Sequence, residues 1–325
     1  MLITVAICTY NRAESLRRTL DSLAAMRVPD GLDWEVVVVN NNCPDHTDAV
    51  IESFADRLPI RPEFEPQGGV SHAKNRAIDV ARGDYIIWTD DDVIVDTGWL
   101  AAYVEAVRRW PEAALFAGLV TPEYETPPAR WIIDSEPFLG DKCFARRNYG
   151  MKPLPLSVGD GRLPVGCNFA VRAMEQRAVR YDVELGYKPG GFLAGEEDDV
   201  ARRLLNAGAS GRWVPEAMIV HCIGQERQTI RYLTKRFTGL GEELALLRDR
   251  SGALAAQADR GAPLVFGAPR WLWRRYAEGW MRYRIHRLIS PPSIWLKHLE
   301  ACSYVRGEIR YWRSRRRLNE ELPLS

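Results

Sequence analysis

The sequence predicts an α/β fold in which a mostly parallel sheet is flanked by helices and followed by a helical C-terminal extension. Apolar, β-branched runs alternate with helical segments along the first part of the chain, a pattern typical of a parallel sheet with helices on both faces. These runs are continuously apolar, as in strands that are buried on both sides. Near the C-terminus, Pro291 and Pro292 separate two segments whose aromatic and aliphatic residues recur at helical spacing.

The expected elements follow one another in order. Strands are expected at 2–8, 34–40, 60–66 and within 83–92, and helices at 13–26, 48–58 and 70–82, with Thr9 or Asn11 as the cap of the first helix. From about 100 to 165 the pattern loosens, and the Pro- and Gly-rich stretches 121–131 and 151–166 indicate loops. A strand at 167–172, a helix at 196–207 and a strand at 211–221 come next.

Composition and charge indicate an ordinary globular protein with two kinds of surface. Of the 325 residues, 46% are hydrophobic and 27% are charged. The net charge of +1 conceals an asymmetry: residues 250–325 hold 15 Lys and Arg against 6 Asp and Glu, whereas the rest of the chain holds 29 against 37. We therefore expect an acidic domain at 1–245 and a basic, aromatic helical extension at 246–325.

Several classes of protein are disfavoured. The six cysteines show no CxxC spacing, which argues against a structural zinc site and is consistent with a reducing cytosol. The N-terminus lacks the features of a signal peptide, and no apolar run approaches the ~18 residues of a membrane span. A cytoplasmic location is expected. Reading the basic tail as a nucleic-acid surface would leave the acidic domain unexplained, so no nucleic-acid partner is expected.

Three polar clusters, at 9–12, 40–42 and 90–92, fall at the ends of expected strands. In open α/β sheets, ligands bind outside the carboxyl ends of the strands. A solvated turn would explain one such cluster, but it explains poorly three that converge on one rim. The carboxylates at 90–92 repel one another, and a divalent cation, which prefers hard oxygen ligands, gives a reason to keep them together.

A second acidic cluster opens the helix at 196–207. Acidic residues in a first helical turn complement the helix dipole, but four in a row at 196–199 exceed what capping needs. Gly190, Gly191 and Gly195 just upstream suit the close approach of a ligand. A histidine such as His221 at a strand end is most often only hydrogen-bonded. Beside an aspartate cluster it becomes a candidate metal ligand, which would favour Mn²⁺ over Mg²⁺.

The order of these motifs carries a resemblance to a known family. The segments are "VAICTYNR", "VVVVNNNCPD", "GGVSHAKNRAIDVARGDYIIWTDDD", "VGCNFAVR", "GEEDDVARRL" and "IVH", over residues 3–240. Together they resemble the family 2 glycosyltransferases of the Rossmann-like GT-A fold. The resemblance implies an enzyme that transfers a sugar, with inversion, from a nucleoside diphosphate sugar (a UDP-sugar favoured) to an acceptor hydroxyl in polysaccharide or glycolipid synthesis. The implied cofactor is Mn²⁺ or Mg²⁺, and the implied partner is a glycan or lipid-linked acceptor.

The resemblance also implies roles for single residues. Asp92 and His221 fall at the metal positions. One acid of the 196–199 cluster takes the place of the catalytic base: counting back from Arg203 favours Glu197, with Asp198 second and Glu196 also a candidate. Asn40 stands where the family usually has an aspartate, and its amide oxygen can still accept from a pyrimidine N–H. Contacts to the nucleotide sugar are implied for Thr9, Tyr10, Asn11, Arg12, Asn40, Asn42, Lys74, Asn75, Asp90 and Asp91.

Two other functions share parts of this pattern. A nucleotidyltransferase of related fold would use the same sheet and metal aspartates, but the chain has no basic, glycine-rich phosphate loop such as GxxxxGK. A non-catalytic nucleotide-sugar-binding module would need no second acidic cluster, and that cluster is intact.

The C-terminal extension contains two stripes at helical spacing. Trp273, Tyr276, Trp280 and Tyr283 form the first. The second consists of Trp295, Leu299, Cys302, Val305, Ile309 and Trp312, and the basic run "RSRRR" follows it. Aromatic rings beside arginines suit the headgroup region of a membrane. We favour attachment to the anionic inner face of the cell membrane; packing of the stripes on the catalytic domain stays open as the alternative.

Overall fold

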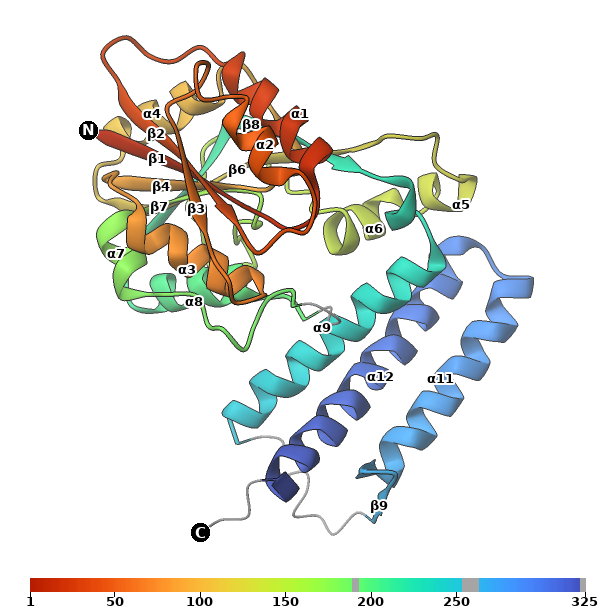
Figure 1. The fold of residues 1–325 in the computed structure, drawn as a ribbon. Coiled ribbons are helices and arrows are strands. Elements are labelled where there is room, and N and C mark those ends of the chain that lie inside the picture. The colour runs from red at the N-terminus through yellow and green to blue at the C-terminus, as the bar shows by residue number, and fades with distance from the viewer. Residues whose placement is uncertain (189–192, 253–262, 322–325) are drawn as a thin grey trace. The chain divides into compact units, whose positions relative to one another are not determined.

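The main body of the chain is an eight-stranded sheet covered by helices on both faces (Figure 1). The computed structural model describes residues 1–188, 193–252 and 263–321, with side chains to residue 315. The strands lie in the order β3-β2-β1-β4-β7-β6-β8-β5. Their bounds are β1 Leu2–Thr9, β2 Asp33–Asn40, β3 Ile60–Phe64, β4 Tyr85–Thr89, β5 Val93–Val95, β6 Ala113–Tyr124, β7 Asn168–Arg172 and β8 Ser210–Ile223. Only the pairs β4–β7, β6–β7 and β5–β8 are antiparallel. The predicted mostly parallel α/β fold is confirmed.

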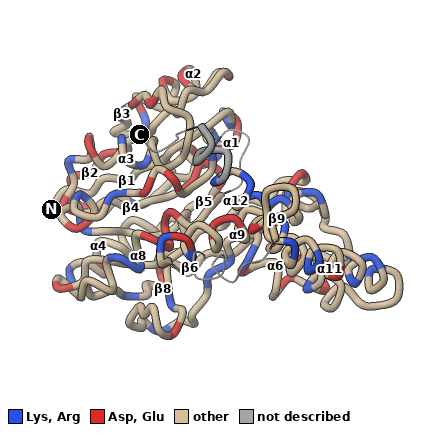
Figure 2. Tube along the Cα trace, turned by 90° about the horizontal axis from the view of Figure 1, so that it is seen from below, with Lys and Arg blue, Asp and Glu red and all other residues tan. Residues whose placement is uncertain are grey.

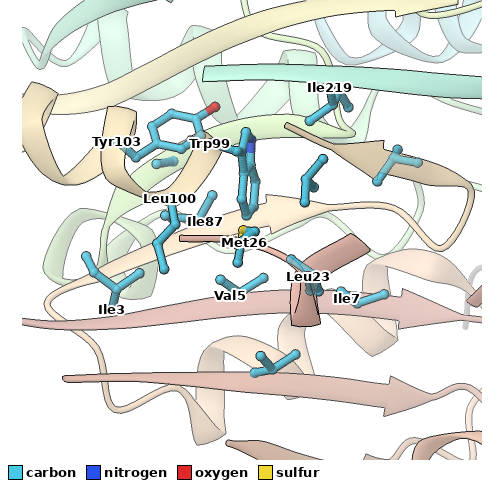
Figure 3. Packing of buried hydrophobic residues seen from close by; sticks show 14 of the residues in the cluster. Ile3, Val5, Ile7, Leu23, Met26, Ile87, Trp99, Leu100, Tyr103 and Ile219 are labelled. Atoms are coloured by element: carbon cyan, nitrogen blue, oxygen red, sulfur yellow. The ribbon is translucent and has the colours of Figure 1, made fainter. Parts of the chain in front are cut away.

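Each face of the sheet has its own apolar core, because successive side chains of a strand point to opposite faces. Val36 and Val38 of β2 lie in one core, and Val37 and Val39 lie in the other. The first core contains residues of the helices α1 Ala13–Ala24, α2 Thr47–Glu52 and α4 Trp99–Arg109. The second contains residues of α3 Val70–Val80, α7 Ala173–Ala178 and α8 Glu196–Asn206. In Figure 3, Trp99 and Met26 point toward one another within the first core.

The structure corrects four expectations about local structure. Helix α2 ends at Glu52, and turns replace the rest of the helix expected to residue 58. Neither Thr9 nor Asn11 caps α1; instead Asp45 accepts a hydrogen bond from the backbone N–H of Ala13 at 3.0 Å. The stretch from about 100 to 165 holds α4 and the long strand β6, which extends into the expected loop at 121–131. Strand β8 runs on past residue 221 to Ile223. Pairing of β6 with β8 explains the longer strands, since sheet partners are not visible in local sequence.

The chain divides into two compact units. The first comprises Met1–Glu125, Gly140–Pro189 and Glu196–Ile223, and the second comprises Thr126–Leu139, Gly190–Gly195 and Gly224–Ser325. Of two short helices, α5 Arg130–Ile133 lies in the second unit. The other, α6 Glu136–Cys143, contains the boundary between Leu139 and Gly140. The expected boundary between a catalytic domain and an extension at residue 245 stays a prediction.

The second unit is built on three long helices that lie side by side in Figure 1: α9 Ile230–Arg250, α11 Arg270–Ile289 and α12 Pro292–Glu321. A two-stranded ribbon, β9 Leu264–Val265 and β10 Ala268–Pro269, precedes α11, and a short 3-10 helix, η1 Gln225–Arg227, precedes α9. The break expected at Pro291 and Pro292 is present. Among the residues that the structure describes, no helix combines the length and the apolar character needed to span a bilayer.

Close packing of α9 against α12 depends on two glycines. A Cβ added to Gly307 would press on the carbonyl oxygen of Thr238 and lie 2.5 Å from the backbone nitrogen of Glu242. A Cβ at Gly241 would press on the backbone of Tyr304. Both obstacles are helix backbone, which cannot turn aside as a side chain can.

We therefore expect Gly307→Ala to destabilise the protein by about 1–3 kcal/mol, although alanine is the better helix former. Thermal unfolding followed by circular dichroism measures the effect. Gly279→Ala serves as the control and should cost less, because its Cβ would come no closer than 3.0 Å to Cys302, with the backbone of that residue at 3.4 Å or more. Equal melting temperatures of wild type and Gly307→Ala would contradict the close helix contact.

Candidate active site

The carboxyl ends of β1, β2 and β4 meet at one rim of the sheet. Thr9 lies opposite Asn40 in the β1–β2 pair, and Ile7 lies opposite Thr89 in the β1–β4 pair. The three aspartates at 90–92 follow β4 and therefore stand beside the end of β1. The chain runs from β1 to β2 and β3 on one side of β1 and then crosses to β4 on its other side, so the end of β1 lies at the switch point at which open α/β sheets bind ligands. The predicted convergence of the three polar clusters is present.

Two of the aspartates are held by residues from the loop after β1. The hydroxyl of Thr9 donates to Oδ2 of Asp91 at 2.7 Å. The half-exposed guanidinium of Arg12 contacts Asp91 Oδ1 at 3.1 Å and Asp92 Oδ2 at 3.0 Å. Burial raises the pKa of Asp91 even though Arg12 opposes it. Burial and then the Asp92 carboxylate raise the pKa of Asp90 to about 6. Negative charge thus remains in excess at this rim, where a cation would be stabilised.

His221 reaches the aspartates through the pairing of β5 with β8. Val93 lies opposite His221, and the backbone N–H of Cys222 donates to the carbonyl oxygen of Asp92 at 2.9 Å. Nδ1 of His221 lies 2.8 Å from the carbonyl oxygen of Phe144. Because a carbonyl only accepts, Nδ1 donates to Phe144, and Nε2 lies on the other side of the ring, 3.4 Å from Oδ1 of Asp92.

This pair fits the divalent cation that the sequence predicts. A backbone carbonyl that fixes the tautomer is the usual support of a histidine that ligates a metal. Within residues 1–188, 193–252 and 263–321, no three His, Cys, Asp or Glu side chains form a group that could hold a metal by themselves. Mg²⁺-type sites commonly use one or two carboxylates together with substrate phosphates, so two protein ligands suffice for such a site.

The loops after β1 and β2 form the predicted nucleoside-binding side of the rim. Tyr10, Asn11 and Asn42 are exposed there, and both asparagines have positive φ angles, of 53° and 61°. Asn40 faces inward: its amide oxygen accepts from the N–H of Cys43 at 2.8 Å, and its amide nitrogen donates to Asp48 at 2.6 Å. The amide oxygen of Asn40, which was expected to accept from a pyrimidine N–H, therefore accepts from the backbone of its own loop and holds that loop in place.

The second acidic cluster is tied to a buried lysine. Nζ of Lys74, on α3, lies 3.2 Å from Oε1 of Glu196 and forms an ion pair with Glu197, both on the first turn of α8. Burial alone would lower the pKa of Lys74, but the two carboxylates raise it well above its ordinary value. A buried ammonium with two carboxyl groups is stable when one of them keeps its proton.

The two glutamates differ in which one keeps that proton. Burial, and then the charge of Glu197, raises the pKa of Glu196 to about 8. Burial would also raise the pKa of Glu197, but the ammonium of Lys74 and a hydrogen bond from Glu196 hold it below its ordinary value. At neutral pH, Glu196 is therefore an acid and Glu197 a carboxylate. Only a carboxylate can accept a proton, so the electrostatics favour Glu197 over Glu196 as the base.

The remaining predicted residues lie near this cluster with other contacts. The carboxylate of Asp198 is 46% exposed and lies 3.8 Å from Arg202, one turn along α8. Asn75 holds the backbone of Tyr181, donating to its carbonyl oxygen at 2.9 Å and accepting from its N–H at 3.0 Å. Gly190 and Gly191 lie outside the described residues.

Replacing Glu196 by glutamine tests the assignment of the proton. Folding raises the pKa of this carboxyl from about 4.5 to about 8, so its contribution to stability is complete below pH 4.5 and is lost as the pH rises through 8. The loss is at most about 1.4 kcal/mol per pH unit. Glu196→Gln lacks this loss, and its stability relative to wild type should rise between pH 5 and 8 in urea unfolding. Glu216→Gln, at an exposed position of β8, is the control; parallel pH curves for wild type and Glu196→Gln would refute the assignment.

Sequence reasoning missed two residues that position the site. The amide of Asn41 donates to the carbonyl oxygens of Glu65 and Gln67 and accepts from the N–H of Gly69, joining the loops after β2 and β3 to α3. Gly166 backs directly on Glu197, whose carboxyl would clash with any Cβ there. The asparagine run at 40–42 was a visible signal for the first, whereas nothing local marks the second.

With this geometry in view, comparisons with known proteins identify the family. The family model described as "Glycosyl transferase family 2" matches residues 4–166, which contain the first two loops, Lys74 and the aspartate triplet. The chain belongs to this family. The predicted resemblance is confirmed. This glycosyltransferase is similar to a curated protein, the succinoglycan biosynthesis protein ExoM of Rhizobium meliloti. The two are 29% identical over 239 residues, which cover 72% of this chain and 71% of ExoM.

Solved structures show the same fold. The mannosyltransferase PcManGT from Pyrobaculum calidifontis, in complex with GDP-Man and Mn²⁺, aligns with a TM-score of 0.58 and 17% identity over 94% of the glycosyltransferase and 86% of that chain. Residues 1–349 of Staphylococcus aureus TarS, in complex with UDP-GlcNAc, align with a TM-score of 0.52 and 14% identity, covering 98% and 92%. The GT-A fold predicted for the chain is confirmed.

Proposed function

We propose that this glycosyltransferase moves a sugar from a nucleoside diphosphate sugar to an acceptor hydroxyl with inversion, using Mn²⁺ or Mg²⁺. The observation that carries the proposal is the separation of two acidic centres at one rim. Asp90–Asp92 and His221 form one centre, and Glu197 with Lys74 forms the other. A single displacement needs positive charge at the leaving diphosphate and a carboxylate that takes the acceptor's proton.

The residues present divide this work as follows. Asp92 and His221 would hold the cation, which when bound stabilises negative charge on the departing diphosphate. Glu197 is ionised and would accept the proton of the attacking hydroxyl. Lys74 pairs with Glu197 here and also influences Asp90. We propose that the phosphates of the donor draw on the same ammonium, which raises the proton affinity of Glu197 as the donor binds.

A UDP-sugar is the favoured donor, and polysaccharide or glycolipid assembly in the cytoplasm is the favoured setting. Support for the setting is the similarity to a succinoglycan biosynthesis protein. The structural neighbours bind different nucleotides, GDP-Man in one case and UDP-GlcNAc in another, so fold similarity does not select between them. A glycan or a lipid-linked glycan is the proposed acceptor.

The test offers purified protein a panel of UDP-, GDP- and dTDP-sugars with Mn²⁺ or Mg²⁺ and measures nucleoside diphosphate release. Release that depends on the metal and on one donor supports the proposal. Pyrophosphate formation from a nucleoside triphosphate and a sugar phosphate would indicate a nucleotidyltransferase instead. Saturable binding of a donor without turnover, with acceptor glycans present, would indicate a binding module.

A further inference from the structure

The turn that joins α11 to α12 exposes a cluster of large apolar side chains. Its members, called the turn patch, are Met281, Ile285, Leu288 and Ile289 of α11 and Ile294 of α12, whereas Trp280 lines a groove with Ile230 and Thr234 of α9. Leu288 is 86% exposed and Ile289 is 73% exposed. Soluble proteins scatter single apolar residues over their surfaces, whereas a contiguous cluster of this kind marks an interaction site.

The turn patch is separate from the apolar residues that hold the helices together. Tyr283 and Leu272 of α11 are buried, as are Trp295, Leu299, Cys302, Val305 and Ile309 of α12. These residues include most of the second stripe expected to face a membrane, so that stripe packs inside the three-helix unit. Because these buried residues already hold the helices together, packing between the helices does not account for the exposed set.

The segment that carries the turn patch has charges of a single sign along its sequence. Between residues 280 and 297 the chain has Arg282, Arg284, Arg287 and Lys297 and no Asp or Glu. In Figure 2, Lys and Arg recur along α11. The guanidinium of Arg284 lies over the ring of Trp280 at 5.4 Å, and that of Arg287 lies over Tyr283 at 5.9 Å. Both arginines thus extend along aromatic rings of α11, the helix that carries most of the exposed apolar residues.

This arrangement matches one kind of partner. Apolar side chains at the end of a helical hairpin can enter the acyl boundary of a bilayer, while arginines and a tryptophan stay at the level of the headgroups. An anionic headgroup layer complements a segment that has four basic residues and no acidic ones between positions 280 and 297. We propose that the turn patch docks the protein on an anionic lipid bilayer. The proposal goes beyond the transferase activity and does not rest on it.

Sedimentation of the full-length protein with vesicles tests the proposal. Wild type should pellet with vesicles containing 30% phosphatidylglycerol in phosphatidylcholine, and at least tenfold less with phosphatidylcholine alone. The double variant Leu288→Glu/Ile289→Glu should lower the partition coefficient at least tenfold. The control Met151→Glu/Met174→Glu replaces side chains that are 66% and 68% exposed on the first unit, and it should bind within twofold of wild type.

Three results would overturn the proposal. Wild type could fail to pellet with anionic vesicles, or the turn-patch variant could pellet as wild type does. Size-exclusion chromatography could instead show that wild type is an oligomer and that Leu288→Glu/Ile289→Glu is not, with vesicle binding the same for both. That result would assign the turn patch to contact with a second copy of the chain. Circular dichroism melting of each variant confirms that binding is measured on folded protein. The double variant Arg282→Gln/Arg284→Gln keeps the apolar residues, and it should also lower the partition coefficient on anionic vesicles at least tenfold.

Discussion

Replacing Asp92 by alanine is expected to lower turnover by about 10³-fold or more, equivalent to about 4 kcal/mol of transition-state stabilisation. Asp92 is the last carboxylate of the triplet, it is buried at the rim, and its Oδ1 lies 3.4 Å from Nε2 of His221. Removing it leaves the histidine as a single protein ligand, which is too weak to place a cation beside a diphosphate.

Two measurements separate loss of the cation from loss of the fold. Mn²⁺ binding, followed by isothermal titration in the presence of a nucleoside diphosphate, should weaken in parallel with turnover. Asp96→Ala is the matched control, because Asp96 lies on the far side of β5 and is exposed. Metal affinity and turnover of Asp92→Ala within threefold of wild type would remove Asp92 from the cation site.

Changing Glu197 to glutamine should lower turnover by about 10²-fold or more while donor binding is retained. The carboxylate is ionised, because Lys74 and Glu196 hold its pKa below the ordinary value, and so it can accept a proton at neutral pH. Glutamine fills the same space against Gly166 but has no lone pair of comparable basicity. Donor affinity measured by titration with a nucleotide sugar should stay within a few-fold of wild type.

Asp198→Asn is the matched control for this prediction, since Asp198 is the next residue of the helix and its carboxylate lies toward Arg202. Its turnover should change less than tenfold. If Asp198→Asn is the inactive variant and Glu197→Gln is active, the base is the next residue along α8. Lys74 would then serve the donor alone.

Much of the fold and part of the site could be predicted from local sequence. The alternation of continuous apolar runs with helical segments indicated a parallel sheet with two covered faces, and the division of the β2 valines between two cores bears this out. The aspartates at 90–92 and the loop at 9–12 stand at strand ends that any such sheet brings together. These features follow from backbone geometry, because the two-residue repeat of a strand fixes the face of the sheet on which each side chain lies.

Local sequence therefore determined the fold class of this protein, the carboxyl edge of the sheet as the place of the site, and the candidate residues. The tertiary structure decided which contacts those residues make. The pairing of β5 with β8 brings His221 to Asp92 across 129 positions of sequence, and only sheet register fixes that contact. The burial of Lys74 between Glu196 and Glu197 decides which acid keeps its proton, since a pKa depends on desolvation and neighbouring charge. The same holds for the extension, where helix packing buries one apolar stripe and leaves the turn patch exposed. Periodicity can place residues on a face, but it carries no information about what that face meets.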